Sequence, residues 1–192
     1  LFKKSLDRFD KICLLAHRKN VRLLVDAEES WIQNAIDEIV LSMMMKYNKE
    51  KAIVFNTSQM YRHDRLNYLK TLHNKALKNN FFVGIKLVRG AYIEKENKRA
   101  KKNNYLSPIC RSKELTDQNF NNGVSYILSN LDRISLFCGT HNEDSIYKII
   151  NIMETKNINR YDQKIWFGQL YGMSDNITSV SYTHLTLPTS TH

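Results

Sequence analysis

The chain has 192 residues, of which 42% are hydrophobic, and a formal net charge of +10 at pH 7. This length supports one packed domain but is shorter than the roughly 250 residues of a complete (β/α)₈ barrel. No run of about 18 apolar residues occurs, so we expect no membrane-spanning helix. Cys13, Cys110 and Cys138 are odd in number and far apart, which argues against a disulfide framework and a CxxC metal site. We therefore expect free thiols, a reducing cytoplasmic compartment and no bound metal.

The positive charge is spread along the chain, as Lys19, Lys70 and Lys164 illustrate. A basic balance is typical of proteins that bind nucleic acid, an anionic membrane or an acidic ligand. Because unpatterned charge is a weak signal, we keep nucleic-acid binding only as an alternative and do not expect it. The first residue is Leu1 and not Met, so we expect the chain to be part of a longer protein.

Short apolar runs alternate with longer amphipathic stretches along the chain. The runs are of strand length and rich in β-branched or aromatic residues, at 21–25, 52–55, 82–88, 134–138 and 165–168. Apolar residues at helical spacing occupy 32–44, 66–77, 116–131 and 146–153. This alternation predicts an α/β fold with a parallel sheet covered by helices. A doubly wound sheet and a partial barrel of about five βα units both fit it.

Each predicted strand runs into polar residues at its carboxyl end. These stretches are 26–29, 56–59, 89–92, 140–143 and 169–173. In α/β folds the carboxyl ends of parallel strands meet at one rim, where functional residues gather. Lys86 stands out because a cation inside an apolar strand is costly unless it is paired. We expect Asp26 or an anionic cofactor to be its partner.

Several of these residues also have purely structural interpretations. Asp26 and Glu29 are suited to cap the helix that begins near residue 31, and Asn142 the helix through residue 150. His141 alone is more often structural than catalytic. Gly90 is consistent with a tight turn. The sequence pattern by itself leaves these alternatives open.

At the strand ends the sequence resembles proline dehydrogenases of the stand-alone bacterial and mitochondrial type. The matching stretches, in order, are LVDAEESWIQNAID (24–37), VFNTSQMY (54–61), KLVRGAYIEKE (86–96), GTHNEDS (139–145) and FGQLYGMSDN (167–176). Five ordered motifs make a specific signal. The resemblance implies an incomplete (β/α)₈ TIM-like barrel over residues 1–180, with FAD at the carboxyl rim. The threonine-rich stretch 181–192 breaks the alternation of strand and helix patterns, and we expect it to be a non-native tail.

The resemblance also implies an activity and a set of site residues. Members of the family oxidise L-proline to Δ1-pyrroline-5-carboxylate and pass the electrons to a membrane quinone. The implied catalytic residues are Asp26 and Lys86. The implied cofactor-binding residues are Ala27, Asn56, Lys86, Arg89, Gly90, Ala91, Thr140 and His141. Tyr92 and Leu170 are implied to line the substrate pocket. Cations at Lys86 and Arg89 are suited to stabilise negative charge on the flavin.

Two features of the family pattern are absent from the sequence. The paired-arginine motif RRxxEN, which binds the substrate carboxylate, does not occur, and neither does a lysine on an early strand, which would precede Leu1. We therefore expect this 192-residue piece to be inactive or unstable on its own. Alternatives to proline oxidation are a Schiff-base aldolase-type barrel that uses Lys86 and a basic nucleic-acid-binding domain. The basic surface also suits peripheral association with the anionic inner membrane of a bacterium.

Overall fold

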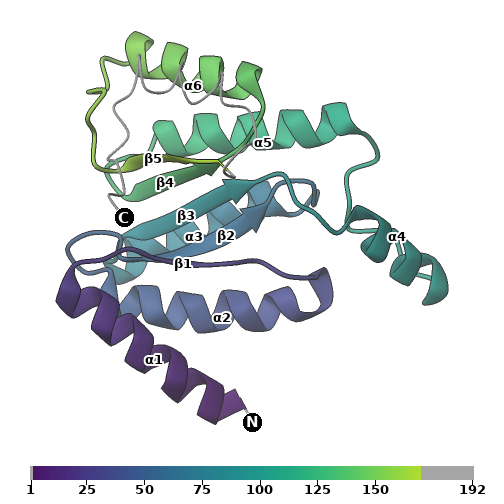
Figure 1. The fold of residues 1–192 in the computed structure, drawn as a ribbon, viewed down its shortest axis with the longest axis horizontal. Helices are drawn as coiled ribbons and strands as arrows, with labels where there is room; N and C mark the ends of the chain where they lie inside the picture. Colours follow the sequence, from purple (N-terminus) through teal and green to yellow (C-terminus); the bar gives the residue numbers. More distant parts are fainter. Residues whose placement is uncertain (1, 170–192) are drawn as a thin grey trace.

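The computed structural model describes residues 2–169 as one curved parallel sheet with helices packed along it (Figure 1). The strands are β1 (Leu23–Val25), β2 (Val54–Gln59), β3 (Val83–Val88), β4 (Ile134–Gly139) and β5 (Ile165–Gly168). The helices are α1 (Phe2–Lys19), α2 (Ser30–Tyr47), α3 (Arg65–Asn79), α4 (Ile93–Lys102), α5 (Lys113–Leu128) and α6 (Glu143–Thr155). Over these residues, no helix is both long enough and apolar enough to cross a membrane.

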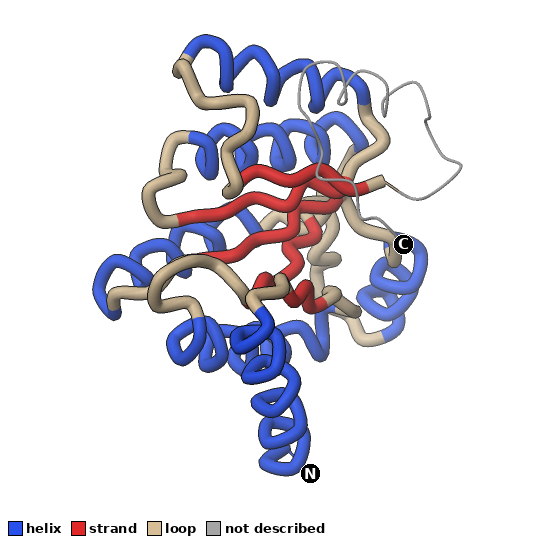
Figure 2. Tube along the Cα trace, turned by 60° about the vertical axis from the view of Figure 1, so that its left-hand side comes forward, coloured by secondary structure: helices blue, strands red, loops and turns tan. Residues whose placement is uncertain are grey.

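The strand order identifies the architecture. The five strands are parallel and lie in the order β1-β2-β3-β4-β5, so each pairs with its neighbour in sequence (Figure 1). Figure 2 shows the strands gathered in one sheet with helices outside it. A doubly wound sheet reverses its order at a switch point, whereas a (β/α)₈ barrel adds each strand beside the last. The sheet is therefore part of a barrel, as the family resemblance implied, and about five βα units are present.

Side chains alternate between the two faces of each strand, and this alternation separates the core from the site. In β3, Val83, Ile85 and Leu87 are completely buried in the main hydrophobic cluster, which includes residues of the covering helices. The intervening Lys86 and Val88 face the opposite, concave side and line a pocket there. Packing on one face thus fixes which residues of a strand reach the pocket.

A contact links the residue that precedes β1 to the last described strand, β5. The guanidinium carbon of Arg22, just before β1, lies 3.9 Å from the centroid of the Trp166 ring in β5. The same guanidinium donates a hydrogen bond of 2.7 Å to the backbone carbonyl of Gln163. A guanidinium stacked on an indole is a favourable cation–π arrangement. The contact joins the two outer strands of the curled sheet among the described residues.

Three elements differ from the sequence prediction. Helices α1 and α4 were not predicted. The helical spacing of Leu6, Phe9 and Cys13 in α1 was overlooked, and α4 has too few apolar residues to show such spacing. Strand β2 does not end at residue 55 but continues through Gln59, and all of its residues are buried. Polar side chains are tolerated there because they are paired, as in the 2.7 Å bond from Thr57 Oγ1 to the carbonyl of Val25.

Candidate active site

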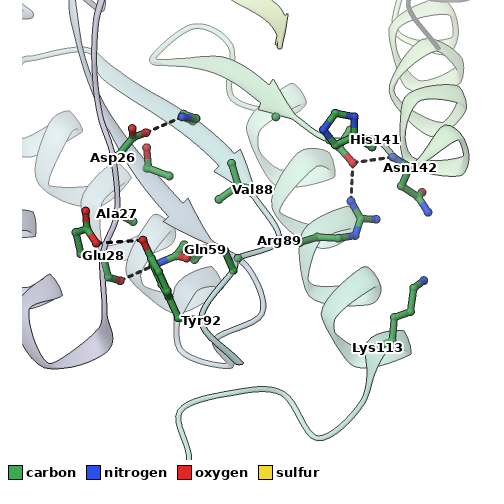
Figure 3. Close-up of a pocket in the computed structure, with 16 residues that line it drawn as sticks. Asp26, Ala27, Glu28, Gln59, Val88, Arg89, Tyr92, Lys113, His141 and Asn142 are labelled. Carbon is green, nitrogen blue, oxygen red and sulfur yellow. Dashed lines mark hydrogen bonds and ion pairs between the residues drawn. The ribbon is translucent and has the colours of Figure 1, made fainter. Parts of the chain in front are cut away.

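A pocket lies at the carboxyl ends of β1 to β4, where the polar strand ends were predicted to meet (Figure 3). Its volume is about 610 Å³. It is lined by Asp26, Ala27, Glu28, Thr57, Gln59, Lys86, Val88, Arg89, Gly90, Ala91, Tyr92, Lys113, Gly139, Thr140, His141 and Asn142. The structure thus brings together nine of the eleven residues that the resemblance singled out, and leaves Asn56 and Leu170 to be considered separately.

Lys86 and Asp26 form an ion pair inside this pocket. Lys86 Nζ donates to Asp26 Oδ1 at 2.6 Å, and their side chains are 24% and 73% exposed. Lys86 comes from the middle of β3, whereas Asp26 follows β1, two strands away. The prediction that Asp26 partners Lys86 is confirmed. Because Asp26 remains open to solvent, the pair is a polar feature of the pocket and contributes little to the fold.

Arg89 fastens several elements of the rim. Its Nε donates to Asp117 Oδ1 at 2.6 Å, Nη1 to Thr140 Oγ1 at 2.6 Å and Nη2 to Ser145 Oγ at 3.0 Å. Burial raises the pKa of Asp117, but hydrogen bonds from Lys113 and Arg89 outweigh it and hold the pKa below its usual range. Arg89 is therefore committed to α5, the loop after β4 and the start of α6. Its main role is to hold the wall of the pocket together, because its guanidinium nitrogens are already bonded to protein groups.

The stretch after Arg89 approaches the opposite wall closely. Gly90 has a φ of +122°, which residues with a side chain rarely adopt, and a Cβ there would lie 2.6 Å from the Tyr61 ring. Tyr92 donates a hydrogen bond of 3.1 Å to Glu28 Oε2, and this bond raises the pKa of Tyr92. Gln59 Nε2 donates to the backbone carbonyl of Glu28 at 2.8 Å. Three strand ends are thereby tied together on this side of the pocket, as Figure 3 shows.

The loop after β4 forms the remaining wall. The backbone N–H of Asn142 donates to Thr140 Oγ1 at 3.1 Å, and Asn142 Oδ1 accepts from the N–H of Ser145 at 2.9 Å. Asn142 is thus the N-cap of α6, which confirms its structural interpretation. His141 lines the pocket, and its Nδ1 is buried without a hydrogen-bond partner among the described residues. A bound polar group is the natural partner for such an atom.

Asn56 is not brought to the pocket. It is fully buried on the other face of β2, where its Nδ2 donates to Asp37 Oδ1 and to the Tyr68 hydroxyl, both at 2.8 Å. Thr57 and Gln59 of the same strand line the pocket instead. Both belong to the polar stretch 56–59 that was expected at the rim, but neither was singled out as a site residue, because the strand was expected to end at residue 55. The period-2 alternation, continued to residue 59, was the signal that could have found them.

Two further expectations concern other parts of the chain. Leu170 and the stretch 181–192 lie outside the described residues. Glu29 occupies the N-cap position of α2, but its side chain makes no capping hydrogen bond, so the proposed capping role of this residue is wrong. The backbone N–H of Ser30 is instead bound by Glu96 of α4, at 2.6 Å.

A flavin fits the chemistry of this donor set. Lys86 places a cation in the pocket, and His141 offers a buried nitrogen with no partner in the described part of the chain. Gly90 lets the backbone approach a ligand without a side chain in between. Cationic groups near a flavin favour its reduction, because reduction adds negative charge to the ring system.

A curled parallel sheet with its strands in chain order and a cation-bearing pocket at the carboxyl rim is the arrangement of (β/α)-barrel enzymes. The sequence model of one such family, proline dehydrogenase, matches residues 2–186. The chain belongs to the proline dehydrogenase family. The structure with the printed description "proline utilization A (PutA) from Bdellovibrio bacteriovorus inactivated by N-propargylglycine" superimposes with a TM-score of 0.87 at 23% identity, over 95% of this chain and 19% of that one. At this identity the likeness supports the shared fold.

Curated relatives match nearly the whole chain. "Proline dehydrogenase 1, mitochondrial" of Drosophila melanogaster is 38% identical over 188 residues, covering 93% of this chain and 28% of that protein. The human protein of the same name is 34% identical over 91% of this chain and 30% of its own length. "Carbapenem antibiotics biosynthesis protein CarD" of Pectobacterium carotovorum is 38% identical over 92% of this chain and 45% of its own length. The chain therefore spans less than half the length of these relatives.

Proposed function

We propose that the chain forms part of the active-site rim of an FAD-dependent enzyme that oxidises L-proline to Δ1-pyrroline-5-carboxylate. The Lys86–Asp26 pair inside a pocket built from four strand ends carries this proposal. Membership of the proline dehydrogenase family supports this proposal. The same membership gives no support to the Schiff-base aldolase or the nucleic-acid-binding alternative. Bound FAD would accept the hydride that leaves the ring carbon next to the proline nitrogen.

The residues of this chain would hold the cofactor and set the electrostatics around it. Lys86 would stabilise negative charge that develops nearby, with Asp26 fixing the position of its ammonium group. Gly90 and Ala91 would let the backbone approach the cofactor closely. His141 Nδ1 would form a hydrogen bond with a polar group of the cofactor. Arg89 would act indirectly, by holding Thr140 against the loop that carries His141.

An anaerobic spectrum tests this proposal and the role of Lys86 together. In the full-length protein that contains this sequence, L-proline is expected to bleach the visible flavin absorption band. Lys86→Met should slow the bleaching about 100-fold, a loss typical of removing one preorganised charge-stabilising group. The fold should tolerate this change because Asp26 stays solvated.

Lys78→Met, on the exposed side of α3, is the matched control and should bleach at the parent rate. A flavin band that ignores proline would contradict the substrate, and a protein without flavin would contradict the cofactor. Equal rates in the two lysine variants would contradict the role of Lys86.

We further propose that the enzyme works on the cytoplasmic side of an anionic membrane, associates with it peripherally and reduces a membrane quinone. The exposed lysines of α4 support this, because Lys98, Lys101 and Lys102 project from a helix at the edge of the fold. Leu106, just after α4, is 92% exposed. Basic residues beside an exposed apolar side chain are typical of lipid-facing surfaces.

Co-sedimentation with vesicles tests the membrane proposal. Binding to phosphatidylserine vesicles is expected at low salt, and it should weaken at high salt because added ions screen surface charges. Replacing Lys98, Lys101 and Lys102 with Gln should reduce it, at about 1 kcal/mol for each lysine that faces the membrane. Binding that is indifferent to salt and to these substitutions would contradict an electrostatic association.

A further inference from the structure

One face of α4 contacts consecutive residues of the segment that forms a pocket wall. The contacting residues of α4 and its N-cap recur at helical spacing, so they share one face. In order, Tyr92 contacts Glu28, Lys95 contacts Glu29, Glu96 contacts Ser30, and Arg99 stacks on Trp31. This segment, 28–31, directly follows Asp26 and Ala27 and leads into α2. The end of the β1–α2 connection and the first residues of α2 thus run along this face of α4.

Glu96 is the buried centre of this contact. It is fully buried, and its two carboxylate oxygens accept from the backbone N–H and the hydroxyl of Ser30, both at 2.6 Å. Ser30 begins α2, so the carboxylate lies at the positive end of the helix dipole. Burial of a charge is costly unless hydrogen bonds compensate for it, and here charge-assisted bonds at a helix N-terminus do so. Glu96 therefore caps α2 from a different helix.

Glu96 also influences the second wall of the pocket. Burial, and then the negative charge of Glu96, raises the pKa of Tyr61 to about 12. The ring of Tyr61 lies directly against Gly90, on the β3–α4 side of the pocket. Glu96 itself belongs to α4, which directly follows the segment that carries Gly90, and its carboxylate binds Ser30, which directly follows the segment that carries Asp26.

We infer that Glu96 is a positioning residue. It fixes the pocket wall formed by residues 26–29 relative to the wall formed by residues 90–92, and so keeps Asp26 beside Lys86. Glu96 does not line the pocket. Its action is transmitted through Ser30 to the short connection that follows β1. The inference rests on the proposed function only for the identity of the ligand, because the geometry it concerns is that of the protein itself.

Two measurements on the full-length protein that contains this sequence, made without any added ligand, test the inference. The first is hydrogen exchange at the Ser30 amide, which Glu96→Ala should accelerate at least about tenfold, because a charge-assisted bond is lost. The second is acylation of Lys86, measured relative to acylation of Lys46 in α2, which pairs with Asp10 of α1. Glu96→Ala should raise this ratio, because Lys86 loses its fixed partner.

Matched variants separate positioning from general destabilisation. Glu94→Ala changes the exposed glutamate of the same helix and should leave both measurements at their parent values. Glu96→Gln keeps the shape and one acceptor oxygen, so it should restore much of the parent behaviour. If Glu96→Ala fails to fold, Ser30→Ala removes the hydroxyl donor alone and should raise the Lys86 ratio to a smaller extent. Equal Lys86 ratios in the parent, Glu96→Ala and Ser30→Ala proteins would overturn the inference.

A third measurement links the positioning role to the ligand. In the full-length protein, Glu96→Ala should weaken FAD binding about tenfold or more, while Glu94→Ala should not change it. Absence of FAD binding in the parent protein would contradict the proposed function but leave the Ser30 and Lys86 tests intact. Parent-like FAD binding in Glu96→Ala, together with unchanged Lys86 labelling, would overturn the inference alone.

Discussion

Replacing Arg65 with Met is expected to lower the free energy of unfolding by about 3–5 kcal/mol, which is the usual cost of breaking a buried ion pair by removing one partner. Arg65 Nη1 lies 2.8 Å from Asp37 Oδ2, and the two side chains are only 5% and 10% exposed. The substitution would leave the Asp37 carboxylate buried with hydrogen bonds from Gln33 and Asn56 but no cation. Urea unfolding followed by circular dichroism measures the loss.

An exposed ion pair provides the control for this experiment. Lys46 pairs with Asp10 at 2.7 Å, but the side chains are 55% and 31% exposed. Lys46→Met should therefore cost far less stability than Arg65→Met, because solvent screens the exposed pair. Adding Asp37→Asn to Arg65→Met should recover part of the stability, because no uncompensated charge remains. Similar losses for Arg65→Met and Lys46→Met would show that burial does not determine the strength of these pairs.

Gly90→Ala is expected to destabilise the fold by about 2–6 kcal/mol, from two independent causes. The backbone at Gly90 has a φ of +122°, and holding a residue with a side chain in such a region costs about 1–3 kcal/mol. The new Cβ would also meet the Tyr61 ring at 2.6 Å, and overpacking typically costs a further 1–3 kcal/mol. Tyr61 is itself fully buried and cannot easily move aside. The same urea titration measures the effect.

Gly123→Ala is the matched control because Gly123 lies within α5, at ordinary helical geometry. Its added Cβ would come 3.0 Å from Met60 Cε, which is the flexible end of a side chain. Alanine favours a helix by about 1 kcal/mol relative to glycine, which offsets this close contact. We expect the stability to stay within about 1 kcal/mol of the parent value. A loss as large as that of Gly90→Ala would argue against backbone conformation as the cause.

The sequence predicted the parts of the fold that depend on local apolar spacing. All five strands and four of the helices were recognised, because each buries a continuous apolar run or stripe. The partnership of Lys86 with Asp26 was also predicted, since a lysine inside an apolar strand requires a counter-charge. Composition left the barrel and the doubly wound sheet equally open, and the ordered family motifs distinguished them.

The remaining parts depend on contacts between distant segments. Helix α4 has little apolar spacing of its own and is held by its contacts with residues 28–31. Asn56 was assigned to the cofactor through the family resemblance, whereas the alternation of side chains along β2 places it on the face that packs against the helices. Glu96 was not singled out at all, since neither spacing nor composition reveals that a glutamate will cap a helix 66 residues away.

The sequential order of the strands bears on how the polypeptide reaches its native state. Each strand docks beside the one made just before it, so the segment closed at each step is much shorter than the whole chain, which limits the entropy lost in each pairing. The bond between Arg22 and Gln163 is the exception, because it joins groups 141 residues apart. Its closure must wait until the last described strand has been synthesised, so growth of the sheet precedes the contact that joins its two outer strands.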